Sequence, residues 1–370
     1  MRACSSTLAL FVIAASLGQT AGCDAPGYPP FDREALLRET TEMVILPGFA
    51  DAATRAGALH TAASALCASP SNATLTSTRS AWIEAMRAWH RTSAYQFGPV
   101  RDMNLGPEVA SWPTDTIAIE TNIAATGTID AHYVDALGSG SKGIYALEYL
   151  LFAYPSFAGA DDARTLAALG DARRCAYTVA LADHVERTTA RAGTAWATTG
   201  GNFAATFIGA GNGGNATYSS QQAAANALVS QIQAAVDTTK ARRVGAPLGR
   251  TVATGAVESP YARASVASME ASMDGVHDAW SLAPHGLEAF LRSRNATLAD
   301  TMLAELASTS AALAALEAPP LATPWESYVA GTDHATGNAA YAQLGMLEAT
   351  IAGDVAATLG LSVVSIADGD

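Results

Sequence analysis

The segment from Gly143 to Phe152 constrains the fold most, because it is an apolar helical pattern that contains a single carboxylate, Glu148. Ile144, Leu147 and Leu151 follow the three- and four-residue spacing of one helix face. Burying an unpaired carboxylate is expensive. Glu148 is therefore either solvated on a helix edge or held at a polar site, where a partner or a raised pKa compensates for burial.

The composition favours packed helices over sheets. The chain has 370 residues, enough for two ordinary domains, and is alanine-rich, 49% hydrophobic and 15% charged. No segment shows the regular alternation of a strand. The sequence therefore predicts an all-α protein built of two helical bundles. The formal net charge of -13 argues against a nucleic-acid partner, and no polybasic patch for anionic lipid is present.

Glycine and asparagine mark the predicted domain boundary. We expect a signal peptide over residues 1–22 and a short tether over 23–31. An N-terminal helical-bundle domain over 32–205 is expected to lead into a Gly/Asn-rich linker over 206–220. A C-terminal helical-bundle domain over 221–370 follows.

The first residues indicate export. Arg2 and the apolar run Leu8–Leu17 have the pattern of a signal peptide. Thr20–Cys23 resembles a bacterial lipobox, with threonine where leucine is usual, which predicts lipidation at Cys23. The alternative is cleavage near Ala21. We expect a lipid-anchored protein of the cell envelope that faces the periplasm or the cell surface. If cleavage occurs near Ala21 instead, the protein is expected to be soluble in the periplasm.

Two cysteines remain after the signal peptide and the lipidated Cys23 are set aside. An exported chain with Cys67 and Cys175 left over favours a disulfide between them, with two free buried thiols as the alternative.

Metallopeptidase chemistry finds no support in the histidine spacing. The H-E-x-x-H pattern is absent, and no two of the seven histidines are four residues apart. His285 and Glu288 form an H-x-x-E pair at an expected helix start, where solvated side chains are common. Glu258, Ser259 and Ser265 form another polar group. A helix-capping role is the simpler interpretation for either serine, since no G-x-S-x-G elbow is present.

The central segment resembles the signature of the imelysin family, G-x-H-x-x-E followed by an apolar run. Gly143 and Glu148 match it, and Tyr145 stands at the histidine position. Other family landmarks occur in the family's order: Trp112-Pro113, Pro247-Leu248-Gly249, Glu258-Ser259, Ser265, Gly275 and Trp280. The resemblance implies two bundle-like domains with a polar cleft where they meet. It also implies export, an association with iron uptake, and a peptidase activity that is assigned to the family.

The resemblance also supplies the candidate site. Its ligand-binding residues are Trp112, Tyr145, Glu148, Glu258, Ser259 and Ser265, and its candidate metal ligands are Glu148 and Glu258. Two nearby carboxylates repel, so one should have a raised pKa unless a cation or a donor lies between them. Tyr145 is a poor metal ligand except for ferric ion, and the site is expected to hold no histidine.

These residues favour one function over two others. We expect a non-catalytic, ligand- or iron-binding accessory protein of iron uptake, with an iron ion as the candidate cofactor and a membrane iron-uptake component as the candidate partner. The alternatives are a metal-dependent peptidase and a purely structural helical protein.

Overall fold

The computed structural model describes residues 30–152, 162–251, 257–317 and 323–362, and these residues form helices and connecting turns without a strand. The predicted all-α fold is confirmed. From Phe31 onward the chain forms one compact unit. The division into two bundle domains, with its boundaries, stays a prediction. None of the described helices is both long and apolar enough to cross a membrane.

The first predicted helix, expected from about Asp32 to Leu66, contains a π-helical turn where Pro47 suggested a break. Helix α1 (Arg33–Thr40) leads through η1 (Thr41–Ile45) into α2 (Leu46–Ala68). Pro47 comes just after this π-helical turn, and Ile45 and Leu46 before it keep helical backbone angles. The chain therefore continues in the same helical path and does not end there.

Helix α3 (Asn72–Arg91) begins earlier than the predicted start at Ser80. Ser71 accepts a hydrogen bond from the backbone N–H of Thr74, and the Thr74 side chain accepts one from the Ser71 N–H. This capping box satisfies backbone donors of the first turn and sets the earlier start.

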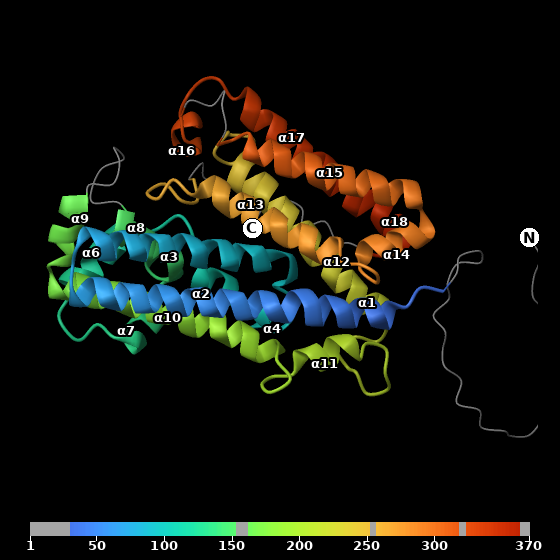
Figure 1. Cartoon of the computed structure of the whole chain (residues 1–370), viewed down its shortest axis with the longest axis horizontal. Helices are drawn as coiled ribbons and strands as arrows, with labels where there is room; N and C mark the ends of the chain where they lie inside the picture. Colours follow the sequence, from blue (N-terminus) through green and yellow to red (C-terminus); the bar gives the residue numbers. More distant parts are fainter. Residues whose placement is uncertain (1–29, 153–161, 252–256, 318–322, 363–370) are drawn as a thin grey trace, which may run out of the picture. The chain divides into compact units, whose positions relative to one another are not determined.

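Helix α2 packs against both α3 and α10 (Ala172–Trp196) (Figure 1). The apolar spacing from Asp161 to Trp196 is that of one continuous helix. The structure has two, α9 (Asp162–Leu169) and α10, and the Asp171 side chain caps the second.

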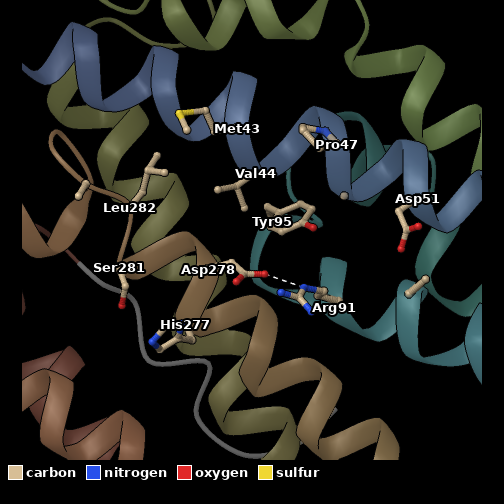
Figure 2. A pocket seen from close by; sticks show the side chains of 13 residues that line it. Met43, Val44, Pro47, Asp51, Arg91, Tyr95, His277, Asp278, Ser281 and Leu282 are labelled. Carbon is tan, nitrogen blue, oxygen red and sulfur yellow. Dashed lines mark hydrogen bonds and ion pairs between the residues drawn. The ribbon is translucent and has the colours of Figure 1, made fainter.

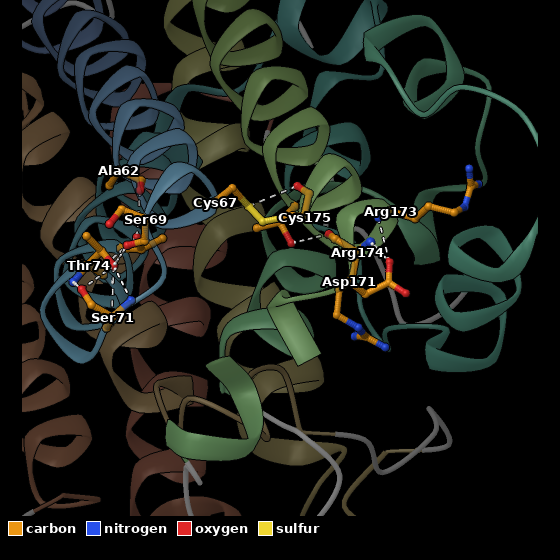
Figure 3. The surroundings of a disulfide bond; sticks show 11 residues. Ala62, Cys67, Ser69, Ser71, Thr74, Asp171, Arg173, Arg174 and Cys175 are labelled. Carbon is orange, nitrogen blue, oxygen red and sulfur yellow. Dashed lines mark hydrogen bonds between the residues drawn. A yellow bond between two sulfur atoms is a disulfide. The ribbon is translucent and has the colours of Figure 1, made fainter. Parts of the chain in front are cut away.

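The predicted disulfide between Cys67 and Cys175 is confirmed (Figure 3). It joins the end of α2 to the start of α10, with Cα atoms 5.6 Å apart and a sequence separation of 108. Short elements connect α3 to the central helix α8 (Gly143–Phe152): η2 (Thr92–Tyr95), α4 (Pro99–Asp102), α5 (Leu105–Val109), α6 (Thr116–Ala124), α7 (Ala131–Asp135) and η3 (Ser139–Ser141).

The second half of the chain is also helical, and α15 and α17 lie side by side in it (Figure 1). Helix α11 spans the predicted boundary at residue 205, and its Phe207 ring lies 5.8 Å from that of Trp196. The elements are α11 (Phe203–Ile208), α12 (Gln221–Asp237), η4 (Thr238–Gly245), α13 (Ser265–Trp280), α14 (Leu287–Arg294), α15 (Ala296–Ala314), α16 (Trp325–Tyr328), α17 (Ala335–Thr350), η5 (Ile351–Val355) and α18 (Ala356–Leu359).

A close helix contact joins the two halves of the sequence. Helix α13 packs on α3 and η2. At Gly275 an added Cβ would lie 1.9 Å from the backbone oxygen of Arg91. Only glycine permits this approach, which brings the loop before α13 against α8.

Candidate functional site

Helix α8 places Tyr145 and Glu148 inside the protein, where neither side chain is exposed. The helix starts at Gly143, whose φ of +79° favours glycine. An added Cβ there would lie 2.5 Å from the Val109 oxygen. The signature glycine thus lets α8 begin against the end of α5. A solvated Glu148 on a helix edge is excluded.

Glu148 accepts three hydrogen bonds through one oxygen. Its Oε1 accepts from the Ser259 hydroxyl at 2.7 Å and from the N–H groups of Tyr261 at 2.9 Å and Ala262 at 2.7 Å. Its Oε2 has no hydrogen-bond partner. Burial raises the pKa of Glu148 to about 8 although these donors favour the charged form. The carboxyl group is therefore mostly protonated at neutral pH.

Glu258 is buried but stays ionised. Burial raises its pKa, but the Arg243 guanidinium, His90, the Ser268 hydroxyl and Tyr145 together bring the pKa below its ordinary value. The Nε of Arg243 lies 2.9 Å from Oε2 of Glu258, and the Ser268 hydroxyl donates to the same oxygen. The two glutamates therefore differ in charge because only Glu258 has a cation beside it.

His90 of α3 lies in this cluster, so the expectation that the site holds no histidine was wrong. Its Nδ1 lies 2.9 Å from a terminal nitrogen of Arg243, and its Nε2 lies 2.8 Å from the Tyr145 hydroxyl. Arginine can only donate, so Nδ1 accepts and the proton is on Nε2. Burial, with a smaller contribution from Arg243, lowers the pKa of His90 to about 4, although Glu258 raises it. The imidazole is neutral.

A signal for His90 was present in the sequence. Trp82, Met86 and Trp89 mark the buried face of α3, and His90 continues that face four residues after Met86. A histidine in a stripe of buried aromatic residues needs a polar partner. Arg243 gave a weaker signal, because a charged residue beside Arg242 near the end of a helix needs no buried partner.

Ser265 and Ser259 hold the loop that carries Glu258. The Ser265 hydroxyl accepts a hydrogen bond from the Ser259 N–H at 3.1 Å, while the Ser265 N–H donates to Glu326 at 3.1 Å. Neither hydroxyl caps α13, whose N-cap residue is Ala264. The capping interpretation was therefore wrong, and both serines fix the loop against Glu148.

Trp112 covers one side of the cluster. Its ring lies 6.2 Å from that of Tyr145, and the guanidinium carbons of Arg242 and Arg243 lie 4.4 and 5.6 Å from its centroid. A cavity of about 290 Å³ opens here, with His90 and Trp112 in its lining. The structure thus brings all six predicted ligand-binding residues into one neighbourhood; their roles stay a prediction.

The arrangement does not fit Glu148 and Glu258 as a pair of metal ligands. Glu148 is protonated, Glu258 is paired with Arg243, and Nδ1 of His90 already accepts a hydrogen bond. Metal ligands must be deprotonated and free to coordinate.

Other acid and histidine groups lie elsewhere. Over the described ranges, the one group of three histidine, cysteine or acidic residues with ligand atoms within 4.8 Å of one another is His60, Asp183 and Glu186, on α2 and α10. His285 bonds to Glu39 at 2.6 Å and not to Glu288, so the H-x-x-E pair does not assemble.

A larger cavity, of about 510 Å³, is a separate feature (Figure 2). Met43 and Tyr95 line it, together with the pair formed by Arg91 and Asp278 at 2.6 Å. It contains none of the predicted site residues.

Two solved structures resemble this one. The first is a protein described as an iron-regulated protein A precursor, from Parabacteroides distasonis ATCC 8503. It has a TM-score of 0.76 and 19% identity, over 91% of this chain and 98% of that one. The second is an imelysin-like protein from Psychrobacter arcticum 273-4. It has a TM-score of 0.73 and 24% identity, over 90% and 97%. At these identities the likeness shows a shared fold.

None of the curated proteins compared with the chain matches it. The family model of Imelysin (Peptidase_M75) matches residues 45–351, which include the signature helix, both glutamates and Arg243. The chain therefore belongs to the imelysin family.

Proposed function

We propose that this imelysin-family chain is a non-catalytic ligand-binding protein of the cell envelope that acts as an accessory to iron uptake. One observation carries the non-catalytic part: Arg243 pairs with Glu258 and donates to His90. Its guanidinium is the cation of the cluster, in contact with the two side chains that could otherwise bind a metal ion.

The other candidate, a metal-dependent peptidase, needs ligands that this site does not offer. A catalytic zinc ion takes three protein ligands and keeps one position open for water. Tyr145 stands where the signature has histidine, and burial holds the pKa of its hydroxyl well above the ordinary value. A neutral phenol is a weak ligand, so the tyrosine serves as a hydrogen-bonding group between His90 and Glu258.

Export and iron uptake rest on weaker support. The sequence begins with a signal-peptide pattern and a lipobox-like segment at Cys23, which lies outside the described residues. One solved structure of the same fold is described as an iron-regulated protein A precursor. An iron ion as cofactor, held by residues other than the pair Glu148 and Glu258, and a membrane iron-uptake component as partner are part of the same proposal.

The test compares metal binding and proteolysis in the mature protein. Thermal shift with ferrous, ferric, zinc and copper ions should show no stabilisation of the wild type by zinc or copper. Casein should stay intact with and without a chelator. A shift with ferric ion alone would make iron itself the ligand.

A gain-of-function variant tests the role of Arg243. The double change Tyr145→His and Arg243→Met removes the resident cation and adds an imidazole beside His90 and Glu258. We expect zinc to stabilise this double variant and to leave the single Tyr145→His variant almost unchanged. Zinc-dependent cleavage of casein by the wild type, abolished by a chelator, would support the peptidase instead.

A further inference from the structure

The cavity of about 290 Å³ meets the buried cluster directly. It lies between η2, the segment after α5, and the helical segment α12–η4. His90 and Arg243 line it although their exposed fractions are only 3% and 5%. A molecule in this cavity would therefore touch the same side chains that hold Glu258 and Tyr145.

The charge of the cavity lining is opposite to that of the protein. The chain has 34 acidic and 21 basic side chains, yet the lining contains two arginines and no aspartate or glutamate. Arg243 is balanced by Glu258. Arg242 is exposed, and over the described ranges no carboxylate forms an ion pair with it. A cationic lining in an acidic protein favours an anionic ligand.

Trp112 orders the two arginines. Both guanidinium groups lie over its ring, at 4.4 and 5.6 Å from the centroid, within the range of a cation–π contact. Consecutive residues of an α-helix point in clearly different directions. Arg242 and Arg243 are consecutive residues of η4, and both nevertheless contact the same aromatic ring. Less side-chain freedom is then lost when a ligand binds.

We propose that this cavity binds a small anion through a carboxylate or phosphate group, held by the guanidinium of Arg242 beside Trp112, with the buried Arg243 in the cavity lining. The inference rests on the proposed ligand-binding function and names its ligand class. Arginine donates in a planar fork that matches carboxylate and phosphate oxygens. The cavity volume lies at the lower end for ligand sites, so the ligand is small. The anionic group could belong to a free organic acid, to inorganic phosphate, or to a carboxylate that chelates ferric ion.

The experiment titrates the mature protein with citrate, inorganic phosphate and ferric citrate, with calorimetry and tryptophan fluorescence as readouts. Trp89 and Trp112 both line the cavity and report on occupancy. At least one anion should bind with a Kd of about 1 mM or tighter, and more weakly at high salt. Arg242→Gln should weaken this binding about tenfold or more, the loss expected for a charge-assisted bond.

Arg250→Gln is the matched control. It removes the same charge from an exposed arginine whose Nε donates to Asn338 at 3.0 Å, away from the cavity lining. This variant should change binding less than about twofold, since the screened surface charge is distant from the ligand. Arg242→Lys keeps the charge without the fork and should give an intermediate affinity. Unchanged melting temperatures establish that each variant folds.

Three results would overturn the inference: no binding of any of the three anions at about 10 mM, equal weakening by Arg242→Gln and Arg250→Gln, or full affinity in Arg242→Gln. Binding of ferric citrate without citrate supports it and identifies the chelate as the source. Proteolysis is measured on the same preparation. A protein that neither cleaves casein nor binds anions refutes this inference alone, whereas zinc-dependent cleavage refutes the proposed function.

Discussion

Replacing Glu148 by glutamine removes the ionisable group of this side chain and keeps its size and shape. Glutamine keeps the oxygen that accepts from Ser259, Tyr261 and Ala262, and it cannot ionise. Its amide nitrogen takes the place of Oε2, which has no partner in the structure. An unsatisfied buried amide lowers stability by about 1–3 kcal/mol at every pH. The informative quantity is therefore how the difference between variant and wild type changes with pH.

The raised pKa fixes the sign of that change. The folded protein retains its Glu148 proton until pH of about 8, whereas the unfolded chain loses it near 4.5. The wild type therefore has its full stability from this group below pH 4.5 and loses it as pH rises through 8. At 1.36 kcal/mol for each pH unit between these values, the loss amounts to at most about 5 kcal/mol. Glutamine has no such loss.

Urea unfolding followed by tryptophan fluorescence measures this difference. From pH 5 to pH 8.5, the unfolding free energy of Glu148→Gln should rise relative to the wild type by up to about 4 kcal/mol. Titration of His90 contributes equally to both proteins and cancels. Glu42→Gln, at an exposed position, should show no pH-dependent difference. A difference independent of pH, or one that becomes more unfavourable at pH 8.5, would show that Glu148 is ionised in the folded protein.

Three further predictions concern the fold and the anchor. Gly143→Ala should lower the unfolding free energy by about 2 kcal/mol or more, because Gly143 has a positive φ and lies close to the backbone of Val109. An unchanged urea midpoint would contradict this prediction. Removing the disulfide by Cys67→Ala with Cys175→Ala should destabilise by about 4 kcal/mol, and reductant should lower the melting temperature of the wild type alone. Cys23→Ala should release the protein into the soluble periplasmic fraction; a wild type already found there refutes lipidation.

Local patterns predicted the helices well and their interruptions poorly. The periodic apolar residues of α8 were sufficient to place it, because amphipathic spacing depends only on neighbours in the chain, whereas the break between α9 and α10 was missed. The π-helical turns at Thr41–Ile45 and Thr238–Gly245 had no such signal. An i→i+5 turn differs from an α-helical turn by one inserted residue, and tertiary packing decides where it forms.

The candidate site could be predicted only in part, because sequence patterns describe neighbours along the chain. Tyr145 and Glu148 share one helix face, so their proximity followed from spacing. The contact of His90 with Arg243 joins residues 153 apart in sequence, and that of Glu148 with Ser259 joins residues 111 apart. No local pattern specifies such pairs, and only the family resemblance pointed to Glu258 and Ser259.

The charge states of the two buried glutamates explain how the site accommodates tyrosine where the family signature has histidine. Each buried carboxylate needs either a proton or a cation. Glu148 is protonated and Glu258 is paired with Arg243, so the charges of the cluster are balanced without a metal ion. Adding a metal ion would require Arg243 to leave, and an isolated buried guanidinium would then be strongly unfavourable. Histidine at position 145 would supply a ligand without removing this obstacle. We therefore expect Arg243, more than Tyr145, to oppose the binding of a metal ion at the site.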